Sequence, residues 1–146
     1  RMAGADGRII AKLNTKLSET TDAPLQIKEI STAKKAGYIV LYNPNSTEVS
    51  TAGLYLTDKP EKLDRWEIPA RSVPAYDELL IVTDNNKTES ALHQLQANFS
   101  LKKGETLILS DKGGNILAEV PVPDIPEGSV YALQDYGQYR AVPSAD

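Results

Sequence analysis

The sequence has 146 residues and contains no cysteine. This absence excludes disulfide bridges, iron–sulfur clusters, thiolate zinc sites and cysteine nucleophiles. Histidine is scarce too: His93 is the only one, which excludes histidine-rich metal centres and leaves a single candidate for imidazole-based catalysis. Long apolar runs are also missing, because a stretch such as residues 79–82 is far shorter than the roughly 20 residues that cross a bilayer. We therefore expect no transmembrane segment.

The chain carries little excess charge of either sign. Its 16 basic and 20 acidic side chains give a net charge of −4 at pH 7. This balance argues against bulk attraction to nucleic acid or to an anionic membrane, and the pairs at residues 34–35 and 102–103 are too small for a nucleic-acid footprint. A hydrophobic fraction of 40% and a mean hydropathy of −0.36 are typical of a soluble globular protein. A fold of this size buries about 70% of its unfolded surface, so one sizeable core is expected.

The first 23 residues differ from the rest of the chain. Apolar residues recur at helical spacing over residues 8–17, which predicts either a short linker helix or a helix docked on the following domain or on a partner. A polar linker follows and ends at Pro24. The start lacks the apolar region of a signal peptide, and Met2 follows Arg1, so we expect the chain to be a segment of a longer protein.

After Pro24, short runs of β-type residues alternate with turn residues. This pattern predicts an all-β antiparallel sandwich or barrel over residues 24–143. The glycines Gly113 and Gly114 supply the positive φ angles of a tight hairpin, which predicts that residues 107–110 pair with residues 116–120. The expected strands are residues 25–30, 38–42, 53–57, 65–68, 79–83, 106–110 and 115–120.

Alternation within these runs divides the side chains between two faces. In residues 38–42 the two tyrosines and Val40 share one face, and Ile39 and Leu41 share the other. Both faces are partly apolar, as in sheets covered on one side by a second sheet and on the other by loops. We expect Trp66, the only tryptophan, to fill the core, with a ligand-stacking platform as the alternative.

Several segments, taken in order, resemble the lamin tail domain family. They are an aromatic-rich strand that ends in Asn43 and Pro44, the Gly-Leu-Tyr-Leu-Thr-Asp stretch over residues 53–58, and the Trp-Glu-Ile-Pro stretch over residues 66–69. The resemblance covers roughly residues 25–139. It implies an immunoglobulin-like β-sandwich that serves as a non-catalytic interaction or targeting module. In bacteria such domains belong to exported or surface-associated proteins, so the resemblance implies an extracellular or cell-surface location.

The residues of these motifs have structural tasks. Asn43 and Pro44 end a strand, because proline cannot donate to a ladder and asparagine supports a turn. Gly53 allows a bend between sheets, and Gly104 reverses the chain before the hairpin. Asp58 is expected to accept hydrogen bonds from the amides of the turn that follows it. The other motif residues with an expected structural role are Trp66 and Pro69.

Two features bear on partner binding. The chain departs from the family at Val40, where members often carry a glutamate, and an apolar residue there indicates a different neighbour or a more buried face. The C-terminal stretch offers Tyr136, Tyr139 and Arg140 as contacts for a protein partner or a neighbouring domain. The alternative for these residues is a tail that packs back on the sandwich.

Two other functions stay open. A carbohydrate-binding β-sandwich would use Tyr42, Tyr55 and Tyr76 as sugar platforms. A hydrolase would have to use His93, and the sequence has no Gly-x-Ser-x-Gly elbow to accompany it.

Carboxylates are paired at the predicted turns, where solvated charge is the simplest interpretation. Residues 84–86 and the pair Asp111 and Asn115 resemble calcium loops but match no EF-hand spacing, which leaves at most a weak surface cation site. We expect no catalytic residue, no cofactor and no metal centre. The pairs considered for glycosidase chemistry are Asp58 with Asp64, Glu61 with Asp64, and Asp77 with Glu78.

Overall fold

The computed structural model describes residues 25–84, 95–134 and 137–143. Within these residues all regular structure consists of strands, and none of it is helical. The helix predicted over residues 8–17 lies outside the described residues, as do His93 and Tyr136.

Six strands form the larger sheet, in the order β12-β11-β1-β2-β7-β8. Neighbouring strands are antiparallel except β7 and β8, which run parallel. Their bounds are Gln26–Ser31 for β1, Tyr38–Tyr42 for β2, Glu78–Val82 for β7, Leu95–Gln96 for β8, Ser129–Leu133 for β11 and Tyr139–Pro143 for β12.

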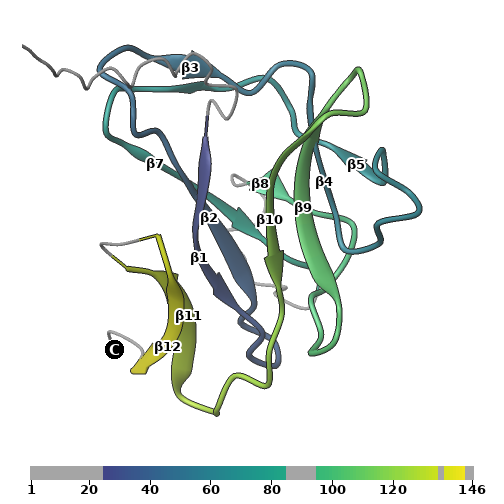
Figure 1. Ribbon diagram of the computed structural model, residues 1–146, viewed down its shortest axis with the longest axis vertical. Helices are drawn as coiled ribbons and strands as arrows, with labels where there is room; N and C mark the ends of the chain where they lie inside the picture. The colour runs from purple at the N-terminus through teal and green to yellow at the C-terminus, as the bar shows by residue number, and fades with distance from the viewer. Residues whose placement is uncertain (1–24, 85–94, 135–136, 144–146) are drawn as a thin grey trace, which may run out of the picture.

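Four strands form the second sheet, in the order β10-β9-β4-β5, and all of its pairings are antiparallel. The two sheets face each other across the core (Figure 1). The chain is therefore an all-β, immunoglobulin-like sandwich, which confirms the predicted fold class. The second sheet contains β4 Leu54–Thr57, β5 Trp66–Glu67, β9 Thr106–Asp111 and β10 Ile116–Pro121, and a separate pair joins β3 Val49–Ser50 to β6 Ser72–Val73.

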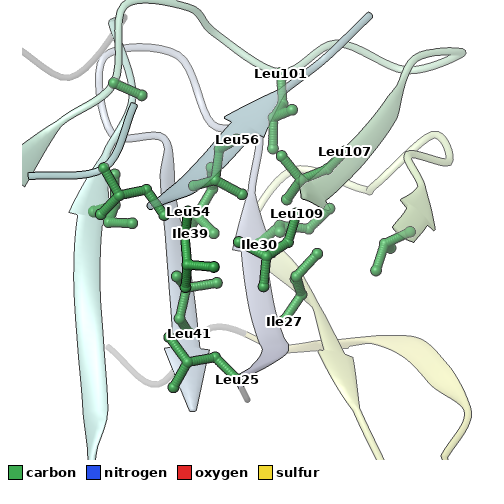
Figure 2. Packing of buried hydrophobic residues seen from close by; sticks show 14 of the residues in the cluster. Leu25, Ile27, Ile30, Ile39, Leu41, Leu54, Leu56, Leu101, Leu107 and Leu109 are labelled. Atoms are coloured by element: carbon green, nitrogen blue, oxygen red, sulfur yellow. The ribbon is translucent and has the colours of Figure 1, made fainter. Parts of the chain in front are cut away.

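The core follows directly from the alternation of side chains along the strands. Ile39 and Leu41 of β2 are fully buried, whereas Val40 between them is half-buried on the other face. On the facing sheet, Leu54 and Leu56 of β4 turn their side chains inward in the same way. Figure 2 shows these side chains from both sheets gathered in one cluster. The hydrophobic effect on this cluster is the main force that holds the two sheets together.

The hairpin between β9 and β10 forms as predicted. The backbone N–H of Asp111 donates to the carbonyl of Asn115 at 3.0 Å, and that of Gly114 donates to the carbonyl of Asp111 at 3.0 Å. Gly114 has a φ of 84°, but Gly113 has no positive φ. Only one of the two glycines therefore takes the left-handed conformation expected of both.

Five strands have no counterpart among the predicted runs, and one predicted role needs correction. The unexpected strands are β3, β6, β8, β11 and β12, of which three contain only two residues. Trp66 packs against the core but does not fill it, because it lies on the short edge strand β5 and stays partly exposed.

Candidate functional site

Asn43 is a structural centre rather than a simple strand end. Its side chain is fully buried, and its amide nitrogen donates to the carbonyl oxygens of Thr47 and Val73, each at 2.9 Å. Its amide oxygen accepts the backbone N–H of Asn45 at 2.9 Å. One side chain therefore ties the β2–β3 turn to the segment that leaves β6, and Pro44 follows it where β2 has ended.

Three other motif residues occupy the turns that they were expected to shape. Gly53 has a φ of 82° in the turn where the N–H of Leu54 donates to the carbonyl of Thr51 at 3.0 Å. Gly104 has a φ of 91° just before β9. The carbonyl of Pro69 accepts the hydroxyl of Thr51 at 2.7 Å, which anchors the segment after β5. These residues order loops at the ends of the sandwich.

Asp58 differs from the expectation. The N–H of Lys59 donates to the hydroxyl of Thr57, at 3.0 Å, so the threonine rather than the aspartate caps this turn. Asp58 is buried and pairs instead with Arg65, whose Nε lies 3.3 Å from Oδ1. The two atoms form an ion pair without hydrogen-bond geometry, and neither has a hydrogen-bond partner among the described residues. The pair joins the first and last residues of the loop between β4 and β5.

Three of the other candidate carboxylates, Asp64, Asp77 and Glu78, make local contacts. Asp64 lies 3.5 Å from the ammonium of Lys62, and both are exposed. Asp77 accepts the N–H of Glu78 at 2.8 Å. Glu78 pairs with Lys28 across the sheet. Across the described ranges, no group of three or more aspartate, glutamate, histidine or cysteine side chains is arranged to hold a metal ion.

A row of side chains crosses the outer face of the larger sheet, pointing away from the core. The register places them directly opposite one another on five neighbouring strands, so they share one face. Leu80 is 42% exposed, Arg140 is exposed, and the three residues between them are half-buried. We call this set the outer row, and its members in order are Leu80, Val40, Glu29, Ala132 and Arg140.

Polar and aromatic groups border the outer row. The ammonium of Lys28 lies 5.1 Å from the ring centroid of Tyr42 and pairs with Glu78 on β7. The hydrogen bond with Glu78 raises the pKa of Lys28 above its usual value, so this side chain stays charged at neutral pH. On the other side of the row, the hydroxyl of Tyr38 donates to the carboxylate of Glu29.

The structure separates the C-terminal residues that were expected to bind partners. The ring of Tyr139 stacks on that of Tyr131, with centroids 5.5 Å apart, and its hydroxyl donates to the carbonyl of Ile27 at 2.6 Å. Tyr139 is therefore used within the domain, as in the alternative of a tail that packs back on the sandwich. Arg140 belongs to the outer row, and Tyr136 lies outside the described residues.

The three tyrosines named as sugar platforms do not form one strip. Tyr42 lies on the outer face of the larger sheet, whereas Tyr55 lies on the outer face of the second sheet. Tyr76 is 61% exposed and has a φ of 59° in the turn before β7. Tyr42 and Tyr76 thus lie near one end of one sheet, and Tyr55 lies on the opposite side of the sandwich.

Sequence reasoning missed Leu80, Glu29 and Ala132 as members of one surface. Alternation along residues 79–82 could have placed Leu80 away from the core, because Ile81 beside it is buried. No local signal could have aligned these residues, since their register depends on strands that are distant in the sequence.

The described part of the chain contains no helix long and apolar enough to cross a membrane.

Comparisons with known proteins leave the family of this chain open. No protein-family model matches the sequence, and no curated protein matches it.

Proposed function

We propose that this domain is a non-catalytic module that binds a protein partner or a neighbouring domain through the outer row. The observation that carries the proposal is an apolar pair at one end of the outer row, where the half-buried Val40 lies beside the exposed Leu80. An antiparallel sheet with one solvated face normally alternates apolar inward and polar outward residues. Leu80, at 42% exposed, breaks that alternation near one edge of the sheet.

The residues around Val40 and Leu80 favour recognition of a protein. Protein interfaces combine an apolar and aromatic core with a polar rim, and arginine and tyrosine are enriched in them. Val40 and Leu80 supply the apolar part, and Tyr42 lies beside them under the Lys28 ammonium. Arg140 closes the row on β12, which is an edge strand of this sheet in the part of the chain that the structure describes. An edge strand offers free backbone groups that a partner can pair with.

The absence of catalytic function is part of the proposal. It is supported by the local ion pairs of three candidate carboxylates: Asp58 pairs with Arg65, Asp64 with Lys62, and Glu78 with Lys28. The resemblance to the lamin tail domain, and with it an exported or surface-associated parent protein, stays a prediction. Val40 departs from the glutamate that members of that family often carry, so no specific binding surface is transferred from the family to this chain.

A cross-linking pull-down from the source cell tests the proposal. The change is Leu80→Glu, which places a charge in the outer row without opening the core, because the side chain is already exposed. We expect a specific protein to be captured by the wild type and its yield to fall about tenfold or more, as for the loss of one central contact. Circular dichroism checks that the variant is folded.

Ile116→Glu is the matched control. Ile116 is 51% exposed and lies on β10 of the second sheet, so it has the same chemistry on another surface. Capture should survive in this variant. Equal capture by Leu80→Glu and the wild type, or loss in Ile116→Glu alone, would contradict the proposal.

A further inference from the structure

We infer that the second sheet carries a separate small-ligand site, a cleft that takes one neutral sugar unit of a glycan. The cleft lies between the loop of residues 61–64 and the hairpin turn of residues 111–114, over Tyr55, and its volume is about 420 Å³. This volume falls within the range of small-molecule pockets in proteins, about 300–1,000 Å³. We call it the loop–hairpin cleft.

Tyr55 is the aromatic residue among those that line the cleft. Leu54 and Leu56 on either side of Tyr55 are buried in the core, so Tyr55 points to the outer face of the second sheet. Across the sheet it faces Ser110, whose hydroxyl donates to the carbonyl of Leu63 at 3.4 Å. The loop therefore lies over the sheet beside the tyrosine ring. A half-buried ring of this kind offers a surface for the C–H face of a sugar.

Both walls are held in place before any ligand binds. The buried pair of Asp58 and Arg65 closes the loop, and the carbonyl of Arg65 accepts the side-chain amide of Asn98 at 3.2 Å. In the hairpin turn, one carboxylate oxygen of Asp111 accepts the N–H groups of Gly113 and Asn115, at 2.9 and 3.0 Å. These bonds lower the pKa of Asp111, so it stays ionised and keeps the turn formed. A preformed site loses less conformational entropy on binding.

The charged groups around the cleft select the class of ligand. Glu61, Asp64 and Asp111 offer acceptors, and Lys62 and Lys112 offer donors, within one small surface. Such near-balanced charge favours neither an anion nor a cation, and the dominance of charged groups disfavours an apolar ligand. A neutral molecule with many hydroxyl groups satisfies both kinds of partner, because each hydroxyl donates and accepts. A hexose unit also has the apolar face that the tyrosine ring requires.

Affinity electrophoresis in native gels tests this site. The probes are soluble starch, xylan, barley β-glucan, galactomannan and laminarin, each included in the gel matrix. We expect at least one of them to retard the wild-type protein, and Tyr55→Ala to abolish that retardation. The double variant Glu61→Gln with Asp64→Asn changes only exposed side chains, so it stays folded even where Tyr55→Ala does not. It should weaken retention about tenfold, as for the loss of charge-assisted hydrogen bonds.

Two controls complete the test. Glu48→Gln with Glu127→Gln makes the same change of charge at exposed positions away from the cleft, and it should leave retardation unchanged. Tyr76→Ala removes an exposed tyrosine from the other sheet and should also have no effect. The inference is overturned if none of the five glycans retards the protein, or if both cleft variants bind as the wild type does. Because the outer row lies on the opposite sheet, the cleft variants should keep the protein partner of that surface.

Discussion

Asn43 connects the β2–β3 turn to the segment that leaves β6 through a single amide group. Its nitrogen donates to the carbonyls of Thr47 and Val73, and its oxygen accepts the N–H of Asn45. The bond to the carbonyl of Val73 is buried, so water cannot replace it when it is lost, whereas the other two bonds are partly buried. The same backbone also connects to β7, since the N–H of Asn43 donates to the carbonyl of Asp77 at 2.9 Å.

We predict that Asn43→Ala lowers the free energy of unfolding by about 2 kcal/mol, because it removes a buried hydrogen bond to the carbonyl of Val73 and two partly buried bonds. The measurement is urea denaturation of both proteins at neutral pH. Asn45→Ala is the control: it removes one exposed side chain that donates to Asn43 at 2.9 Å but keeps the backbone bond. Its effect should stay below about 1 kcal/mol. Equal losses in the two variants would show that the burial of Asn43 is unimportant.

At the scale of the elements, the β9–β10 hairpin combines a glycine turn with a carboxylate cap. Gly114 takes the left-handed conformation, and Asp111 accepts two backbone N–H groups of the turn. A register shift between Ile116 and Ala118 follows directly after the turn. Such a bulge bends the strand and increases its twist, which lets β10 follow the curved edge of its sheet.

The two adjacent glycines provide a matched pair of substitutions. We predict that Gly114→Ala costs about 1 kcal/mol or more, because an L side chain is strained at a φ of 84°. Gly113→Ala should cost less: its φ is not positive, and the added Cβ meets the flexible side-chain amide of Asn115 at 3.2 Å. Thermal unfolding of the two variants measures both effects. A larger loss in Gly113→Ala would contradict the assignment of the strained position to Gly114.

At the scale of the whole molecule, the C-terminal hairpin of β11 and β12 joins the larger sheet through the pairing of β11 with β1. β11 meets β1 at two register pairs only, Glu29 with Ala132 and Ile30 with Tyr131. Tyr139 adds a second attachment, because its hydroxyl reaches the carbonyl of Ile27 and its ring packs against the core. This attachment keeps Arg140 on the same face as Val40, so it also shapes the outer row.

We predict that Tyr139→Phe lowers the free energy of unfolding by about 1 kcal/mol at neutral pH, the usual effect of one lost hydrogen bond. It should also change the pH dependence. Burial raises the pKa of Tyr139 above its ordinary value of 10.0, so the unfolded chain ionises first. The stability from this group is present below about pH 10 and declines as pH rises toward the folded-state pKa. The Tyr139→Phe protein should lack this part of the decline in its free energy of unfolding, because phenylalanine does not ionise.

Urea denaturation from about pH 7 to about pH 11 separates the two effects. Tyr76→Phe is the control, because it removes the hydroxyl of a tyrosine whose side chain is 61% exposed. This variant should keep the decline in stability at high pH. A Tyr139→Phe protein that loses stability above pH 10 as steeply as the wild type would contradict the role of burial at this position.

The order of residues along the chain determined the β-sandwich, the inward faces of its central strands and the β9–β10 hairpin. These features depend on local rules, because the alternation that buries Ile39 and Leu41 has a period of two and a tight turn needs glycine nearby. The short strands β3, β6 and β8 could not be predicted, because two residues are too few to show an alternation of apolar and polar side chains. The strands β11 and β12 owe their existence to pairing with each other and with β1.

Only the tertiary structure decided which distant side chains meet. Asp58 was expected to cap its own turn, but folding buries it against Arg65, whose charge offsets part of the cost of removing the carboxylate from water. Likewise, Val40 and Arg140 lie in one row because strand register joins segments a hundred residues apart. Local preferences act over a few residues. Strand register and burial depend instead on the free energy of the whole folded chain.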